Sequence, residues 1–200
     1  MASPSAIAAT TAAIKALLDR AAAGSSDFST VTVSTFRTDD LQTPPTGEAS
    51  APVVSIYLYR VTLSSVRVGR PAIVDRDGRR VRAPIVLDLH YLLTAWARSA
   101  LMQQKLLGWA IRALEDNPVL PATLLNDGGW DGTFGATETV ELVWQPLTPQ
   151  EEWDLWQVAQ TSQQPSAIYL ARGVALDSLI PVVEGPLVQT VELDYAEAPG

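Results

Sequence analysis

The feature that most constrains the fold is one long alternating segment, residues 53–63. It reads Val-Val-Ser-Ile-Tyr-Leu-Tyr-Arg-Val-Thr-Leu and contains neither glycine nor proline. Such a run of β-branched and aromatic residues is typical of a strand. Strict alternation places Tyr57 and Tyr59 on one face and predicts that Arg60 ends the aliphatic opposite face. This segment is the strongest strand signal in the chain, and it predicts a protein built around a sheet.

Helical and strand patterns follow one another along the rest of the chain. The periodicities predict helices at 5–23, 99–115 and 148–160, and further strands at 27–37, 85–94, 139–146 and 166–176. Two segments are predicted to be loop or connector, 38–52 and 118–138. This order predicts an α/β (α+β) single domain with one mixed, mainly antiparallel sheet and helices packed on it.

The expected domain spans residues 1–183 and carries a hairpin insertion at 64–84. An acidic C-terminal tail, 184–200, follows it, with 187–193 as a candidate last strand. The insertion holds most of the positive charge: seven of the fourteen basic residues lie between Arg60 and Arg82, whereas no Lys or Arg follows Arg172. A chain with a basic segment and an acidic tail can stack on copies of itself or on complementary neighbours.

The hairpin is predicted to turn at Asp77-Gly78 and to protrude from the body. Three interpretations remain open for it. It is a docking arm for an acidic neighbouring protein, a solvated surface hairpin, or a contact for nucleic acid. We favour the docking arm, in which the contact residues are Arg67, Arg70, Arg76, Arg79, Arg80 and Arg82.

Composition argues against several classes of function. The chain has no cysteine and a single histidine, so we expect neither a thiolate site nor a zinc site. Only carboxylate sites for hard cations remain possible, and we predict no metal and no cofactor. The net charge of -8 argues against general binding to nucleic acid or to an anionic membrane. No run of about 18 apolar residues predicts a membrane span, and the N-terminus lacks the pattern of a signal peptide.

One pair of side chains could supply catalytic groups. Asp88 and His90 share a face of the 85–94 strand and are read either as an acid/base pair or as a structural polar pair. We favour the structural reading, because no phosphate-binding loop and no nucleophile elbow accompanies the pair. We therefore predict no enzyme activity and no catalytic residue. Trp153 and Trp156, on one face of the 148–160 helix, are expected to pack in the core, and Trp130 to be exposed on a glycine turn.

Several ordered motifs resemble one known family. Residues 52–59, Pro-Val-Val-Ser-Ile-Tyr-Leu-Tyr, are similar to its "P-x-x-S-L-Y-L-Y" strand, and residues 88–95, Asp-Leu-His-Tyr-Leu-Leu-Thr-Ala, to its "D-L-H-Y-L-L-T-A" segment. Trp156 in a short helix, followed by Ser-Ala-Ile-Tyr at 166–169, resembles the closing helix and strand. The family is the cap or tail-terminator protein of extracellular contractile injection systems of the antifeeding-prophage and virulence-cassette type, long catalogued as a domain of unknown function. The motif residues are Tyr57, Tyr59, Asp88, His90, Tyr91 and Trp156.

The resemblance implies a tail-terminator-like fold and a structural role. Such a cap would be a homo-oligomeric ring, a hexamer, at the end of the particle distal to the baseplate, where it ends polymerisation of the inner tube and the sheath. The implied partners are the chain itself, the inner-tube protein and the sheath protein, with no membrane and no nucleic acid. The protein would be cytoplasmic during assembly and then part of the particle. The family's C-terminal extension is expected to be absent here. The alternative is a neck or baseplate adaptor that binds another component or cargo.

Overall fold

The computed structural model describes residues 4–43, 51–65, 73–74, 78, 80–178 and 180–182. The helices are α1 (Ala6–Ala23), α2 (Thr38–Gln42), α3 (Ala100–Glu115), α4 (Ala122–Leu125) and α5 (Pro149–Val158). The strands are β1 (Thr32–Phe36), β2 (Val53–Leu63), β3 (Ile73–Val74), β4 (Arg80–Val81), β5 (Ile85–Trp96), β6 (Val119–Pro121), β7 (Thr139–Trp144) and β8 (Ser166–Leu176).

Six strands form the central sheet, in the order β1-β2-β5-β8-β7-β6. Only β1 and β2 run parallel, and the other four pairs are antiparallel. The short strands β3 and β4 pair with each other as a separate antiparallel ribbon. The predicted single α+β domain with a mixed, mainly antiparallel sheet is therefore confirmed.

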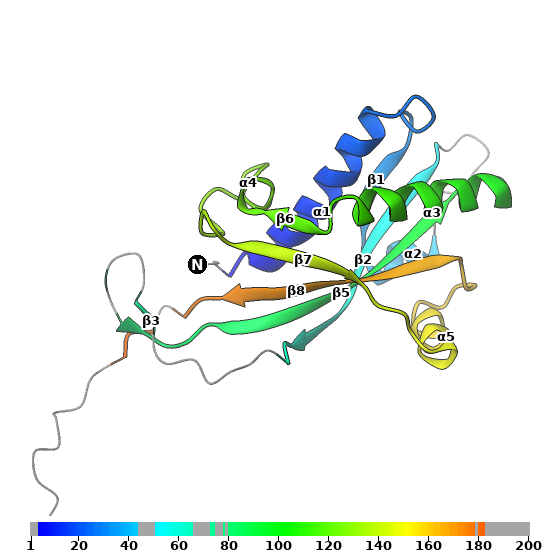
Figure 1. Ribbon diagram of the computed structural model, residues 1–200. Coiled ribbons are helices and arrows are strands. Elements are labelled where there is room, and N and C mark those ends of the chain that lie inside the picture. Colours follow the sequence, from blue (N-terminus) through cyan, green and yellow to red (C-terminus); the bar gives the residue numbers. More distant parts are fainter. Residues whose placement is uncertain are drawn as a thin grey trace, which may run out of the picture.

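One face of the sheet is covered by α1 and α3, which cross it above the strands (Figure 1). The main core lies in this layer, where Leu18 of α1 and Leu106 of α3 meet alternate residues of the strands. Tyr91 is buried there, and its hydroxyl lies 2.8 Å from the hydroxyl of Thr11. The apolar residues that recur at the strand and helix periods of the sequence are thus buried in one shared layer.

The opposite face is covered at one end only. There α5 and α2 place Trp156 and Leu41 against Leu92 and Trp96 of β5 and against Ile168 of β8. Figure 1 shows α5 on the other side of the sheet from α1 and α3. The remainder of this face carries polar side chains, including Asp88 and His90.

Two β-bulges interrupt the alternation, and the first corrects a prediction. Leu58 lies opposite Tyr91, but Arg60 lies opposite His90, so β2 carries one extra residue at Tyr59. Because opposed residues share a face, Arg60 lies on the polar face with His90 and not on the aliphatic face. The second bulge lies in β8, where Leu87 and Leu89 of β5 pair with Val174 and Ala171.

Three predictions about loops were incomplete. The predicted loop 38–52 begins with α2, which buries Leu41. The start of this helix is capped, because the Arg37 amide donates to Asp40 Oδ2 at 2.7 Å. The predicted connector 118–138 contains β6 and α4. Trp130 in the same connector is partly buried against the main core rather than exposed.

Candidate functional site

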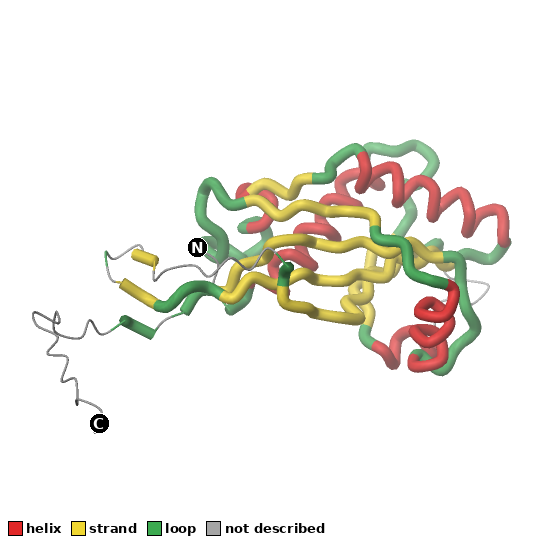
Figure 2. Tube along the Cα trace, turned by 60° about the horizontal axis from the view of Figure 1, so that its bottom comes forward, coloured by secondary structure: helices red, strands yellow, loops and turns green. Residues whose placement is uncertain are grey.

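The described part of the arginine-rich hairpin, β3 and β4, lies beyond the end of the main sheet, past β5 and β8 (Figures 1 and 2). Its ribbon pairs Ile73 with Val81, and Gly78 has a positive φ of 77°, as a tight turn requires. Val81 is buried and forms a bridge with Pro181, so the chain from the end of β8 returns to brace the hairpin. Among the predicted contact residues, Arg80 and Arg82 are exposed. The other four lie outside the described residues: Arg67, Arg70, Arg76 and Arg79.

The polar face of the sheet brings Asp88 and His90 together in one open hollow of about 530 Å³ with Arg60 and Arg172. Each bonds to a different partner. Asp88 Oδ1 accepts the Gly173 amide at 3.1 Å, and His90 Nε2 lies 2.9 Å from the Thr62 hydroxyl on β2.

These bonds support the structural reading of the pair. Gly173 has a φ of 79°, a conformation that glycine adopts readily, and Asp88 satisfies the amide that the β8 bulge frees. Burial, together with the nearby Arg60 guanidinium, lowers the pKa of His90 below its usual 6.5. His90 is thus a neutral, cross-strand hydrogen-bonding group near neutral pH.

The aromatic motif residues lie around this hollow and under α5. The Tyr57 hydroxyl lies 2.9 Å from that of Thr38, which ties β2 to α2. The Tyr59 ring meets the His90 ring edge-on, with the ring centroids 6.0 Å apart. The Tyr59 hydroxyl is buried without a hydrogen-bond partner among the described residues, and burial raises the pKa of Tyr59.

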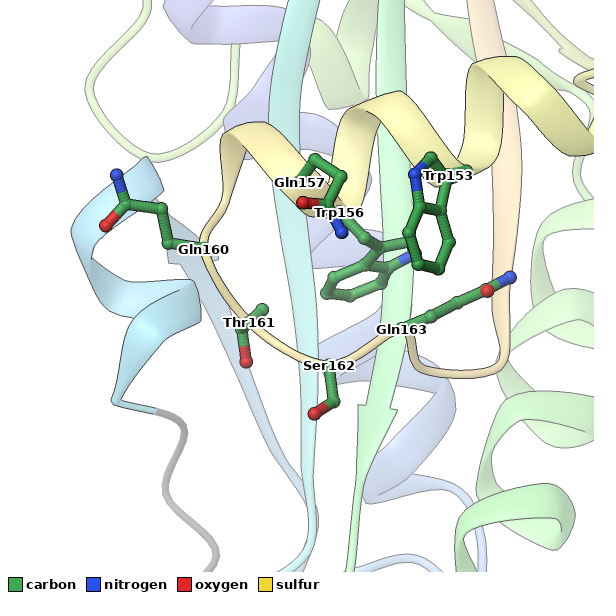
Figure 3. Close-up of a pocket in the computed structure, with 7 residues that line it drawn as sticks. All are labelled: Trp153, Trp156, Gln157, Gln160, Thr161, Ser162 and Gln163. Atoms are coloured by element: carbon green, nitrogen blue, oxygen red, sulfur yellow. The ribbon is translucent and has the colours of Figure 1, made fainter.

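Trp153 and Trp156 line a second hollow of about 650 Å³ beneath α5. Figure 3 shows both side chains below the helix, with the loop 160–163 curving under them. Trp156 is buried, as predicted, but Trp153 is 53% exposed, so the prediction of core packing holds for only one of the two. Trp156 Nε1 is buried without an acceptor in the described part of the chain.

The open edge of β2 is the feature that sequence reasoning missed. The register of β1 with β2 runs from Val53 to Tyr57, and no described strand covers the outer side of β2 from Leu58 to Leu63. Beside this edge lies a mainly apolar groove of about 580 Å³, bounded by Ile7 and Thr11 of α1, Leu58 and Trp130. The edge is open because β1 is shorter than β2, and no residue of β2 itself indicates this.

Neither a metal-binding cluster nor a membrane-spanning helix occurs among the described residues. The described residues contain no group of three or more His, Asp or Glu side chains that could hold a metal ion. Within the described ranges, no helix is both long and apolar enough to cross a membrane.

The described residues thus combine an open strand edge, two exposed arginines of the hairpin and a polar pair that is hydrogen-bonded to the sheet. The chain belongs to the family described as the Pvc16 N-terminal domain, which matches residues 9–190. The resemblance drawn from the motifs at Tyr57 and His90 is therefore confirmed.

Solved structures agree with this assignment. A sheath/tube terminator of the PVC extracellular contractile injection system, in its extended state, superposes with a TM-score of 0.60 at 16% identity, covering 96% of this chain and 65% of that one. The tube-terminating cap of the anti-feeding prophage gives a TM-score of 0.51 at 14% identity, covering 90% of this chain and 60% of the other. This chain thus spans less than two thirds of the length of each. No curated protein matches the sequence.

Proposed function

We propose that this chain is a structural cap of a contractile injection particle. In this role it forms a ring that ends polymerisation of the inner tube and sheath at the end distal to the baseplate. Membership of the Pvc16 N-terminal domain family carries the proposal, and the two solved chains compared above are described as a sheath/tube terminator and a tube-terminating cap. The adaptor alternative has no comparable support.

The geometry is consistent with a role that needs contact and not chemistry. Asp88 and His90 are engaged with Gly173 and Thr62, which leaves the pair bonded to the scaffold and not to each other. The polar face and the β2 edge are surfaces on which other chains could pack. A cap of this kind acts by covering the last subunits of a polymer and offering no template for the next.

The partners follow from the same role. The ring would be a hexamer of this chain that contacts the last ring of the inner tube and the last ring of the sheath. It would assemble in the cytoplasm and leave with any particle that is released. The exposed Arg80 and Arg82 make the hairpin the leading candidate for contact with an acidic neighbour.

The proposal is tested by locating the protein in its particle. The chain is labelled at its N-terminus with a small tag and purified particles are viewed by electron microscopy with a gold-conjugated tag ligand. Label at the end opposite the baseplate supports the cap. Label at the baseplate would favour the adaptor, and label along the whole sheath would contradict both.

A further inference from the structure

The open edge of β2 presents backbone groups that a strand could use. The Ser64 amide donates to the Val86 carbonyl at 2.9 Å, so the backbone groups of Ser64 and, by alternation, of Thr62 point toward β5. The amide and carbonyl groups of Val61 and Leu63 therefore point outward. No described strand pairs with this row, and a row left open in this way is a template for one added strand.

The side chains along this edge determine which kind of strand would fit it. Val61 and Leu63 lie on the α1 face and are 43% and 55% exposed. On the other face, Arg60 is exposed, and no described carboxylate forms an ion pair with it. The apolar groove between α1 and Leu58 lies at the end of the edge nearest β1. The edge thus fits a strand that is apolar on one face and acidic opposite Arg60.

The chain itself contains such a segment. Residues 187–193 read Leu-Val-Gln-Thr-Val-Glu-Leu, and they lie outside the described residues. Their alternation places Val191 and Leu193 on one face and Thr190 and Glu192 on the other.

We propose that residues 187–193 of a neighbouring copy add to the open edge of β2 as an antiparallel strand, with Val191 opposite Val61. The register places Glu192 opposite Arg60 and directs Leu193 toward the groove beside Leu58. A parallel strand in the same register would instead place Thr190 opposite Arg60, so that no carboxylate of the added strand lies directly opposite the guanidinium.

A neighbouring copy is the occupant because of where the described chain leads. Val182, the last described residue, donates its amide to the Arg80 carbonyl at 2.8 Å, so the described chain ends against the hairpin, beyond the end of the sheet (Figure 2). An edge on one copy and a strand from the next form a head-to-tail contact, which closes into a ring when the rotation allows. The inference rests on the proposed ring.

The test uses the absence of cysteine from the sequence. Thr62 and Thr190 would form a non-hydrogen-bonded pair, the closest approach between antiparallel strands and within the range of a disulfide. Thr62→Cys and Thr190→Cys are prepared as separate variants, mixed in equal amounts and oxidised. We expect a disulfide-linked dimer that contains both variants, and none when Glu197→Cys replaces Thr190→Cys.

Other outcomes overturn the inference. No mixed dimer, in a preparation whose native mass is still that of a ring, would refute the strand contact and leave the cap function intact. An intrachain disulfide in the Thr62→Cys/Thr190→Cys double variant, without linked dimers, would show that the segment docks on its own chain. Linkage through Glu192→Cys in place of Thr190→Cys would show the parallel register.

A charge exchange tests the register independently. Arg60→Glu and Glu192→Arg should each weaken self-association by up to about fivefold per contact, and the double variant should restore it. Arg98→Glu, an exposed arginine after β5, is the matched control and should change nothing. Losses in the single variants that add in the double variant would contradict the pairing of Arg60 with Glu192.

Discussion

Trp156 offers a direct test of how α5 is held on the sheet. It is the only buried residue within the helix and is 1% exposed, packed against Leu92 and Trp96. Replacing a buried tryptophan by alanine costs about 3–5 kcal/mol, a large part of the roughly 5–15 kcal/mol that stabilises a domain. For a chain of 200 residues this corresponds to a fall in Tm of about 6–20 °C.

Trp156→Phe separates the packing of the Trp156 ring from the cost of burying its Nε1–H. The ring remains apolar, but the Nε1–H, which lacks an acceptor among the described residues, is removed. Since a buried donor without a partner costs about 1–3 kcal/mol, its removal offsets much of the lost packing. We expect Trp156→Phe to cost no more than about 2 kcal/mol and Trp153→Ala, at a half-exposed side chain, to cost less than either Trp156 variant.

The assay is urea unfolding followed by circular dichroism, with thermal scans beside it. Trp156→Phe as damaging as Trp156→Ala would refute the reasoning, because it would mean that Nε1 has a strong acceptor. A Trp156→Ala variant that unfolds at the same urea concentration as the unmodified protein would show that α5 is not held by this residue.

Three further predictions concern the polar face and the hairpin. Asp88→Ala should lower the free energy of urea unfolding by about 1–3 kcal/mol, because the Gly173 amide loses its acceptor. An unchanged unfolding midpoint would mean that the β8 bulge does not need the Asp88 carboxylate. Because the pKa of His90 is lowered in the folded protein, the unfolded chain takes up the proton more readily, and stability present above pH 6.5 is lost as pH falls below it. The His90→Gln variant should therefore lose less stability on acidification. A pH profile of stability identical to that of the unmodified protein would contradict this. Reversal of Arg79, Arg80 and Arg82 to glutamate should impair particle assembly or length control, with Arg98→Glu as the control, and normal particles would count against the docking arm.

Much of the fold could be predicted because its elements carry their own periodicity. Residues 53–63 and 166–176 form strands with the predicted bounds, and the helices at 5–23 and 99–115 differ from α1 and α3 by one residue at the start. Alternation over these lengths decides which side chains a sheet can bury. Trp156 was expected to pack in the core, and it is buried.

The features that matter for contacts were less predictable, because they depend on pairing between distant segments. The bulge at Tyr59 turns Arg60 to the polar face, and nothing in the local pattern shows it. The open edge from Leu58 to Leu63 exists because β1 is short. The roles of Asp88 and His90 required the positions of Gly173 and Thr62, which lie far from them in sequence.

The central claim is that this chain ends the growth of a tube and its sheath. The most direct measurement is the distribution of particle lengths by electron microscopy after its gene is deleted from the particle cluster and after it is restored on a plasmid. The account predicts tubes and sheaths of uncontrolled length without the protein, and a single length on restoration. Particles of normal, uniform length in its absence would contradict the account.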